Sequence, residues 1–152
     1  MTLIIETASW GSLELTGEQI FFFDKGLPGF EEFKKFALIV LDDSPFSYLQ
    51  SVDDKNISFM LVDPFAFYPN YEFELPDEEA LELGIEDRIS IRSMLTLQKP
   101  LEDSTVNLLA PLVLNPLNGK AKQVILHQTV YQTRHPLWSS VHSNISAKGE
   151  GE

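Results

Sequence analysis

Alternation of apolar and polar side chains is the feature that most constrains the fold of this chain. Over residues 88–98, apolar side chains at positions 89, 91, 95 and 97 alternate with arginine, serine, threonine and glutamine. A period of two is typical of a strand with one buried face and one wet face. Residues 71–75 (YEFEL) alternate in the same way, and so in part do residues 105–115 (TVNLLAPLVLN). In the second segment Pro111 cannot donate to a ladder, which indicates an edge or a bulge.

Continuous apolar runs predict further strands. FALIVL (36–41) and ISFMLV (57–62) suit strands that are covered on both faces, and QVILHQTVYQ (123–132) is the last strand that we predict. Asn118-Gly119 favours positive φ and predicts a hairpin within NPLNGKAK, and residues 53–56 predict another. Asp77 follows a proline and is a candidate N-cap for one short helix that ends near Gly84.

The stretch FDKGLPGFEEF (23–33) predicts a tight chain reversal. Gly26 and Gly29 flank Leu27-Pro28, and either glycine can adopt positive φ. We expect Phe23 to end a strand, and Phe30 and Phe33 to fold back under the core. A second single helical turn is predicted over residues 31–35.

Together these patterns predict an all-β, mainly antiparallel fold with one or two short helices. Roughly eight to ten short strands with tight connections suit a small β-barrel-like or sandwich domain. With 152 residues in all, we expect one domain over residues 1–138. The small, polar segment 139–152 is predicted to be a flexible tail.

Charge and composition narrow the classes of function. The formal net charge is −12, with −15 in residues 1–87 and +3 in residues 88–152. A negative field repels phosphate backbones, so we expect no direct nucleic-acid binding. The chain contains no cysteine, and no apolar run approaches the roughly 20 residues that span a bilayer. We therefore expect a cytoplasmic protein without a membrane segment. Because the sequence shows no heptad pattern and no long apolar edge strand, we expect a monomer.

Catalytic and metal-binding patterns are absent from the sequence. The histidines at 127, 135 and 142 lack the spacing of a metal site, and no phosphate-binding loop or nucleophile elbow occurs. We expect no cofactor, no metal and no catalytic residue. Carboxylates are abundant, which leaves one alternative open: a small barrel enzyme or ligand-binding domain that uses paired carboxylates.

Aromatic side chains gather in two proline-flanked segments, SPFSYLQS (44–51) and DPFAFYPNYEF (63–73). Rings on stiff loops lose little entropy on binding and can anchor an interface. The alternative is that each ring caps the barrel. The excess of carboxylates favours a partner that is itself basic.

Five motifs occur in an order that resembles the flagellar assembly factor FliW family. They are F-x-x-G-L-P-G-F-E (23–31), P-F-x-x-L-Q-S (45–51), V-D-P-F (62–65), S-T-V-N-L-x-A-P-L-V-x-N (104–115) and K-x-K-Q-V-I-L (120–126). The resemblance implies a compact β-barrel-like protein that is not an enzyme. It also implies two protein partners, flagellin and the carbon storage regulator CsrA, a small RNA-binding translational repressor. Binding CsrA would relieve its repression of flagellin synthesis.

The motifs also supply candidate protein-binding residues. The P-F-x-x-L-Q-S and D-P-F segments give most of them, and two asparagines in the fourth motif are polar candidates. The predicted set is Phe46, Leu49, Gln50, Asp63, Phe65, Phe67, Asn107 and Asn115.

Overall fold

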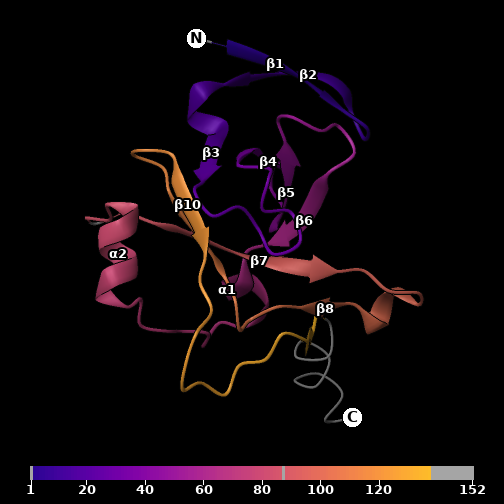
Figure 1. Cartoon of the computed structure of the whole chain (residues 1–152). Helices are drawn as coiled ribbons and strands as arrows, with labels where there is room; N and C mark the ends of the chain where they lie inside the picture. The colour runs from indigo at the N-terminus through magenta and orange to yellow at the C-terminus, as the bar shows by residue number, and fades with distance from the viewer. Residues whose placement is uncertain (1, 87, 138–152) are drawn as a thin grey trace.

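A closed barrel of seven strands forms the centre of the molecule (Figure 1). The computed structural model describes residues 2–86 and 88–137. In ring order the barrel strands are β7 (Ser90–Thr96), β6 (Ser58–Val62), β5 (Phe46–Ser51), β4 (Lys35–Val40), β3 (Ile20–Phe23), β10 (Lys120–Gln123) and β9 (Leu112–Asn115). Pairing of β7 with β9 closes the ring, Ile91 opposite Val113. All neighbours are antiparallel except β3 and β10.

Four further strands lie outside the barrel. The hairpin of β1 (Thr2–Thr7) and β2 (Gly11–Thr16) forms a separate two-stranded sheet over one end (Figure 1). The short strands β8 (Thr105–Val106) and β11 (His135–Pro136) extend the main sheet beyond β7. Two 3-10 turns, η1 (Gly17–Gln19) and η2 (Leu101–Asp103), complete the connections around them. The all-β prediction is therefore confirmed.

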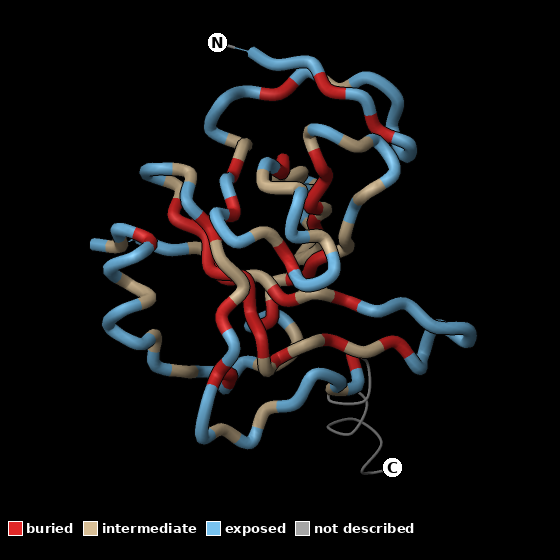
Figure 2. The backbone as a smooth tube through the Cα atoms, viewed as in Figure 1, coloured by how far each residue is buried: buried red, intermediate tan, exposed pale blue. Residues whose placement is uncertain are grey.

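Inward-facing side chains from all parts of the ring fill the barrel. Phe23, Phe36, Leu49, Leu61 and Leu114 are fully buried there, and Figure 2 shows the buried positions concentrated along the central strands. Each such side chain stabilises the fold by about 1.5–3 kcal/mol relative to an exposed position. Burial of these side chains is therefore the main source of stability. The rings of the core also pack edge to face, as in the pair Phe23–Phe36.

The predicted reversal at residues 23–33 closes one end of this core. Gly26 has φ +65°, and a Cβ there would lie 2.6 Å from the backbone of Glu31, so only glycine fits. Leu27 is 1% exposed and packs in the barrel core, with Phe30 and Phe33 partly buried against it. The expectation that these rings fold under the core is confirmed.

Two short helices pack on the outside of the barrel. Helix α1 (Pro64–Phe67) begins after Asp63, whose Oδ1 accepts a hydrogen bond from the Phe65 amide. Helix α2 (Asp77–Leu83) ends at Gly84, as predicted, and Gly84 has a left-handed φ of 65°. Pro76 rather than Asp77 occupies the N-cap position of α2, one residue earlier than predicted. Residues 31–35 form turns and the start of β4 instead of the predicted helical turn.

Other differences concern extended segments. Residues 71–75 alternate in burial as predicted, yet they form no strand. Their apolar side chains pack on the barrel, but their backbone pairs with no other strand, and the Tyr71 amide donates to the Tyr68 carbonyl (2.9 Å). The last predicted strand, 123–132, is also wrong, since the pairing segment lies earlier, at β10. Pro111 falls in the gap between β8 and β9, and the hairpins at 53–56 and 118–119 are present. The predicted tail, 139–152, lies outside the described residues.

Candidate protein-binding interface

The eight predicted interface residues fall into three separate places in the fold. Four gather around α1 (Phe46, Asp63, Phe65 and Phe67), and two are buried residues of β5 (Leu49 and Gln50). The two asparagines form hydrogen bonds with backbone groups at other points. The structure therefore does not bring the set together as one surface. Among these eight residues only Phe65 is well exposed, with 42% of its surface accessible to solvent.

The group around α1 combines structural and surface roles. The Asp63 amide donates to the Pro45 carbonyl (2.8 Å), which places the start of α1 beside β5. Phe46 and Phe67 contact each other with ring centroids 5.9 Å apart and are partly buried against the outer face of the barrel. Phe65 lies over Tyr71 at 5.7 Å and leaves the rest of its ring to solvent. Phe65 is thus the ring that a partner can reach.

Leu49 and Gln50 are buried and cannot touch a partner in this structure. Leu49 is 0% exposed and belongs to the barrel core. Gln50 is 1% exposed, and its Nε2 faces the turn between β5 and β6. It lies 3.1–3.3 Å from the carbonyl oxygens of Ser51, Asp54, Lys55 and Ile57. The L-Q pair therefore shapes the core and a turn.

The two asparagines also have internal partners. Asn115 is 1% exposed, and its Nδ2 donates to the carbonyls of Leu83 (2.9 Å) and Gly84 (3.1 Å) at the end of α2. Asn107 Oδ1 accepts from the amides of Leu109 and Ala110. Asn107 also lines an apolar hollow of about 310 Å³ at the mouth of the barrel, beside Pro28 and Met94.

An aromatic cluster stabilises the face of the barrel below α1. The Tyr71 hydroxyl donates to the Leu108 carbonyl (2.8 Å), and burial raises the pKa of Tyr71, so the phenol stays protonated. Its ring packs edge to face on Tyr131 at 4.7 Å. Burial lowers the pKa of the nearby His135, whose Nε2 accepts from the Gln132 amide (2.8 Å). Most rings of the 63–73 segment thus serve packing.

The segment that contains α2 carries the densest negative charge. Residues 72–86 include seven carboxylates and no lysine or arginine. Lys122 of β10 pairs with Glu79 and with Glu82 (3.1 Å), and this hydrogen bond holds the pKa of Glu82 below its ordinary value. These contacts fix α2 to the barrel. Glu72, Glu74 and Asp77 have no ion pair within the described part of the chain.

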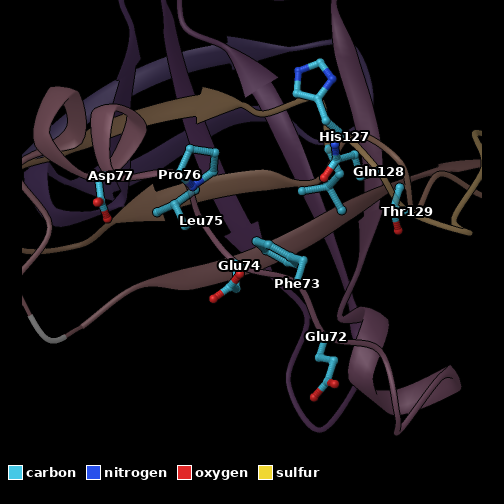
Figure 3. A pocket seen from close by; sticks show the side chains of 10 residues that line it. Glu72, Phe73, Glu74, Leu75, Pro76, Asp77, His127, Gln128 and Thr129 are labelled. Carbon is cyan, nitrogen blue, oxygen red and sulfur yellow. The ribbon is translucent and has the colours of Figure 1, made fainter.

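A groove of about 560 Å³ runs beside these three carboxylates (Figure 3). Residues 72–77 form one wall and residues 126–129 the other, and we call it the 72–129 groove. Both walls are irregular, and Gln128 has φ 52°. None of the predicted residues lies in it. The signal was present in the sequence, because YEFEL places two glutamates on the face opposite its apolar side chains.

The groove is open, and its three carboxylates are exposed to solvent. Among residues 2–86 and 88–137, no group of three or more metal-ligating side chains occurs, and no helix is long and apolar enough to cross a membrane. What the arrangement offers is hydrogen bonding, negative charge and a few accessible apolar rings. These are properties used in binding other molecules.

Comparisons with known proteins identify the family. The family described as FliW protein matches residues 4–137. The flagellar assembly factor FliW of Bacillus subtilis (strain 168) is 44% identical over 138 residues, covering 89% of this chain and 96% of the relative. That of Desulfitobacterium hafniense (strain DSM 10664 / DCB-2) is 43% identical over 148 residues, covering 95% and 97%.

A solved structure agrees with these relatives. The crystal structure of the flagellar assembly factor FliW superposes with a TM-score of 0.82 at 39% identity, covering 89% of this chain and 96% of that one. The family match over residues 4–137 spans the barrel, both helices and the outer strands except the first two residues of β1. This chain belongs to the FliW family of flagellar assembly factors.

Proposed function

We propose that this chain is a cytoplasmic regulator without catalytic activity that binds flagellin and the translational repressor CsrA. Binding CsrA relieves its repression of flagellin synthesis, and flagellin competes for the chain, so the flagellin level feeds back on its own translation. The observation that carries the proposal is the family match across residues 4–137. The chain acts as a monomer and contacts no nucleic acid directly.

Charge supports the choice of a basic regulator as partner. A protein that binds RNA carries a positive electrostatic potential. A chain with a net charge of −12 attracts such a protein over a distance that the salt concentration sets. Such steering raises the association rate more than the final affinity. The repressor should therefore bind more slowly as salt is added, whereas its dissociation rate should change little.

Apolar surface supports the second partner. Amphipathic helices bind by laying an apolar face against accessible hydrophobic side chains. Phe65 offers such a ring, and the hollow beside Pro28 and Met94 offers a second apolar surface. We propose Phe65 as an anchor for flagellin. Of the predicted set, Asp63 holds the start of α1 because its Oδ1 accepts from the Phe65 amide, and Phe46 and Phe67 pack on each other.

The experiment is a pair of separate titrations, of the purified chain with CsrA and with flagellin, by calorimetry. Both are expected to bind. Phe65→Ala is expected to weaken flagellin binding by at least about 1 kcal/mol, as truncation of an anchor ring does. The matched control is Phe22→Ala on β3, because that ring is also 42% exposed. Binding of neither protein would refute the proposal, and equal losses in the two variants would remove Phe65 as the anchor.

A further inference from the structure

Along residues 73–75 and 127–129 of the 72–129 groove, the backbone amides donate to no acceptor in the described part of the chain, whereas the flanking amides of Glu72 and Leu126 donate to the Tyr131 hydroxyl and the Leu109 carbonyl. Phe73, Glu74 and Leu75 donate no amide hydrogen bond in the described part of the chain, and their carbonyls accept none. On the other wall, His127, Gln128 and Thr129 likewise donate none. Unpaired extended backbone, as in the first wall, is a template for an added strand, whereas the second wall bends at Gln128, which has φ 52°.

Side chains hold the first wall in the extended form. Tyr71, Phe73 and Leu75 face the barrel and pack in its outer clusters, and the Glu72 amide donates to the Tyr131 hydroxyl (3.2 Å). Glu72 and Glu74 are consequently exposed, and Figure 3 shows their carboxylates pointing away from residues 127–129. The wall is thus ordered before any ligand arrives, which lowers the entropic cost of binding.

Charge decides between candidate occupants. Adding the same wall of a second copy would bring glutamates against glutamates, and like charges facing across a strand pair are destabilising. A segment that carries lysine or arginine would instead place its cations near Glu72, Glu74 and Asp77. These three carboxylates have no ion pair within residues 2–86 and 88–137. The opposite wall contributes leucine, histidine, glutamine and threonine to the lining, and none of these is a permanent cation.

We propose that the 72–129 groove binds an extended, lysine- or arginine-containing segment of a partner protein by strand addition along residues 72–75. At about 3.3 Å per residue, such a segment pairs over about four residues before Pro76 ends the wall. Main-chain hydrogen bonds supply the affinity, and the three carboxylates select for positive charge. The inference rests on the proposed function only in taking the chain to act by binding proteins.

The test uses the full chain and a blocked hexapeptide of alternating valine and lysine, followed by NMR. We expect the amide signals of residues 73–75 and 127–129 to shift on titration and to gain protection from hydrogen exchange. The same peptide with methylated backbone amides, and a peptide of alternating valine and glutamate, are expected not to bind. Failure of the lysine peptide to bind, or equal binding of the methylated peptide, would overturn strand addition.

Matched double variants test the role of the carboxylates. Glu72→Gln with Glu74→Gln is expected to weaken the peptide by about three- to tenfold. The control, Glu14→Gln with Glu18→Gln, removes the same charge from exposed positions near the β1–β2 hairpin and should change affinity by less than about twofold. Equal losses in the two double variants would show that only the overall field matters and would overturn the site.

Two outcomes separate this inference from the proposed function. If CsrA and flagellin bind but the peptide does not, the proposed binding site in the groove is wrong and the proposed function is supported. If the peptide binds at the groove but neither CsrA nor flagellin binds, the proposed function is wrong and the proposed binding site is supported.

Discussion

Asn115 offers a sharp test of how the barrel holds α2. Its side chain is 1% exposed and makes three hydrogen bonds: Nδ2 donates to the Leu83 and Gly84 carbonyls, and Oδ1 accepts from the Leu117 amide (3.0 Å). Asn115→Ala removes all three. At about 0.5–1.5 kcal/mol for each bond, the free energy of unfolding should fall by about 1.5–4.5 kcal/mol.

Equilibrium urea unfolding measures this loss. For a urea m-value of about 2 kcal/mol/M, the midpoint should fall by about 1–2 M with an unchanged slope. Asn115→Asp keeps the shape and the acceptor but places a carboxylate against two carbonyl oxygens, so it should be at least as destabilising as Asn115→Ala. The control is Asn70→Ala, because Asn70 is exposed and its side chain makes no hydrogen bond in the described residues; its effect should stay within about 0.5 kcal/mol.

A small effect at Asn115, no larger than the effect at Asn70, would refute the reasoning. It would mean that α2 is held by the apolar contact of Leu83, the Lys122 ion pairs and the hydrogen bond from Asn118 Nδ2 to the Leu83 carbonyl (3.0 Å). The asparagine would then be a buried polar group of little energetic consequence.

Three further predictions concern backbone strain and pH. Gly11→Ala should lower the free energy of unfolding by about 1–2 kcal/mol, because φ at residue 11 is +69° although nothing lies within 4 Å of the new Cβ. Gly26→Ala should cost about 1–3 kcal/mol more, because its Cβ also clashes with the backbone of Glu31. Thermal unfolding of the two variants measures the difference. Burial lowers the pKa of His135 in the folded state below its ordinary value of 6.5, so the stability that the neutral imidazole contributes is complete above pH 6.5 and is lost as pH falls through the folded-state pKa. In urea melts, His135→Phe should therefore lose less stability than wild type between pH 7.5 and pH 5.5. Equal losses in the two proteins would contradict this. The hydrogen bond from Lys122 holds the pKa of Glu82 below 4.5. Wild type should therefore be more stable than Lys122→Met at pH 7, and this difference should narrow as pH falls below 4.5. A difference that stays constant in unfolding curves recorded at acid pH would contradict the interaction between Lys122 and Glu82.

Local patterns predicted the local elements well. The alternation over residues 88–98 became β7, Asn118-Gly119 became the β9–β10 turn, and Gly84 ended α2. Each of these is decided by neighbours in the chain, through side-chain period or positive φ. Pairing between distant segments has no such signal. The closure of β7 on β9 and the parallel contact of β3 with β10 therefore appear only in the structure.

Alternation also has two physical causes that sequence does not separate. In β7 the alternation accompanies strand pairing, whereas at 71–75 it reflects burial of one side in a segment that pairs with no other strand. The candidate residues show the same limit. Gln50 and Asn115 stand out in their motifs, and in this fold both donate to backbone carbonyls from buried positions.

The most direct test of the function is a competition in one sample. The chain is mixed with CsrA until the complex forms, flagellin is added stepwise, and the complexes are separated by size-exclusion chromatography with light scattering. If the chain exchanges between its two partners, flagellin should displace CsrA in proportion to its concentration, and free CsrA should appear. A stable complex of all three proteins, or CsrA that stays bound at saturating flagellin, would contradict mutually exclusive binding.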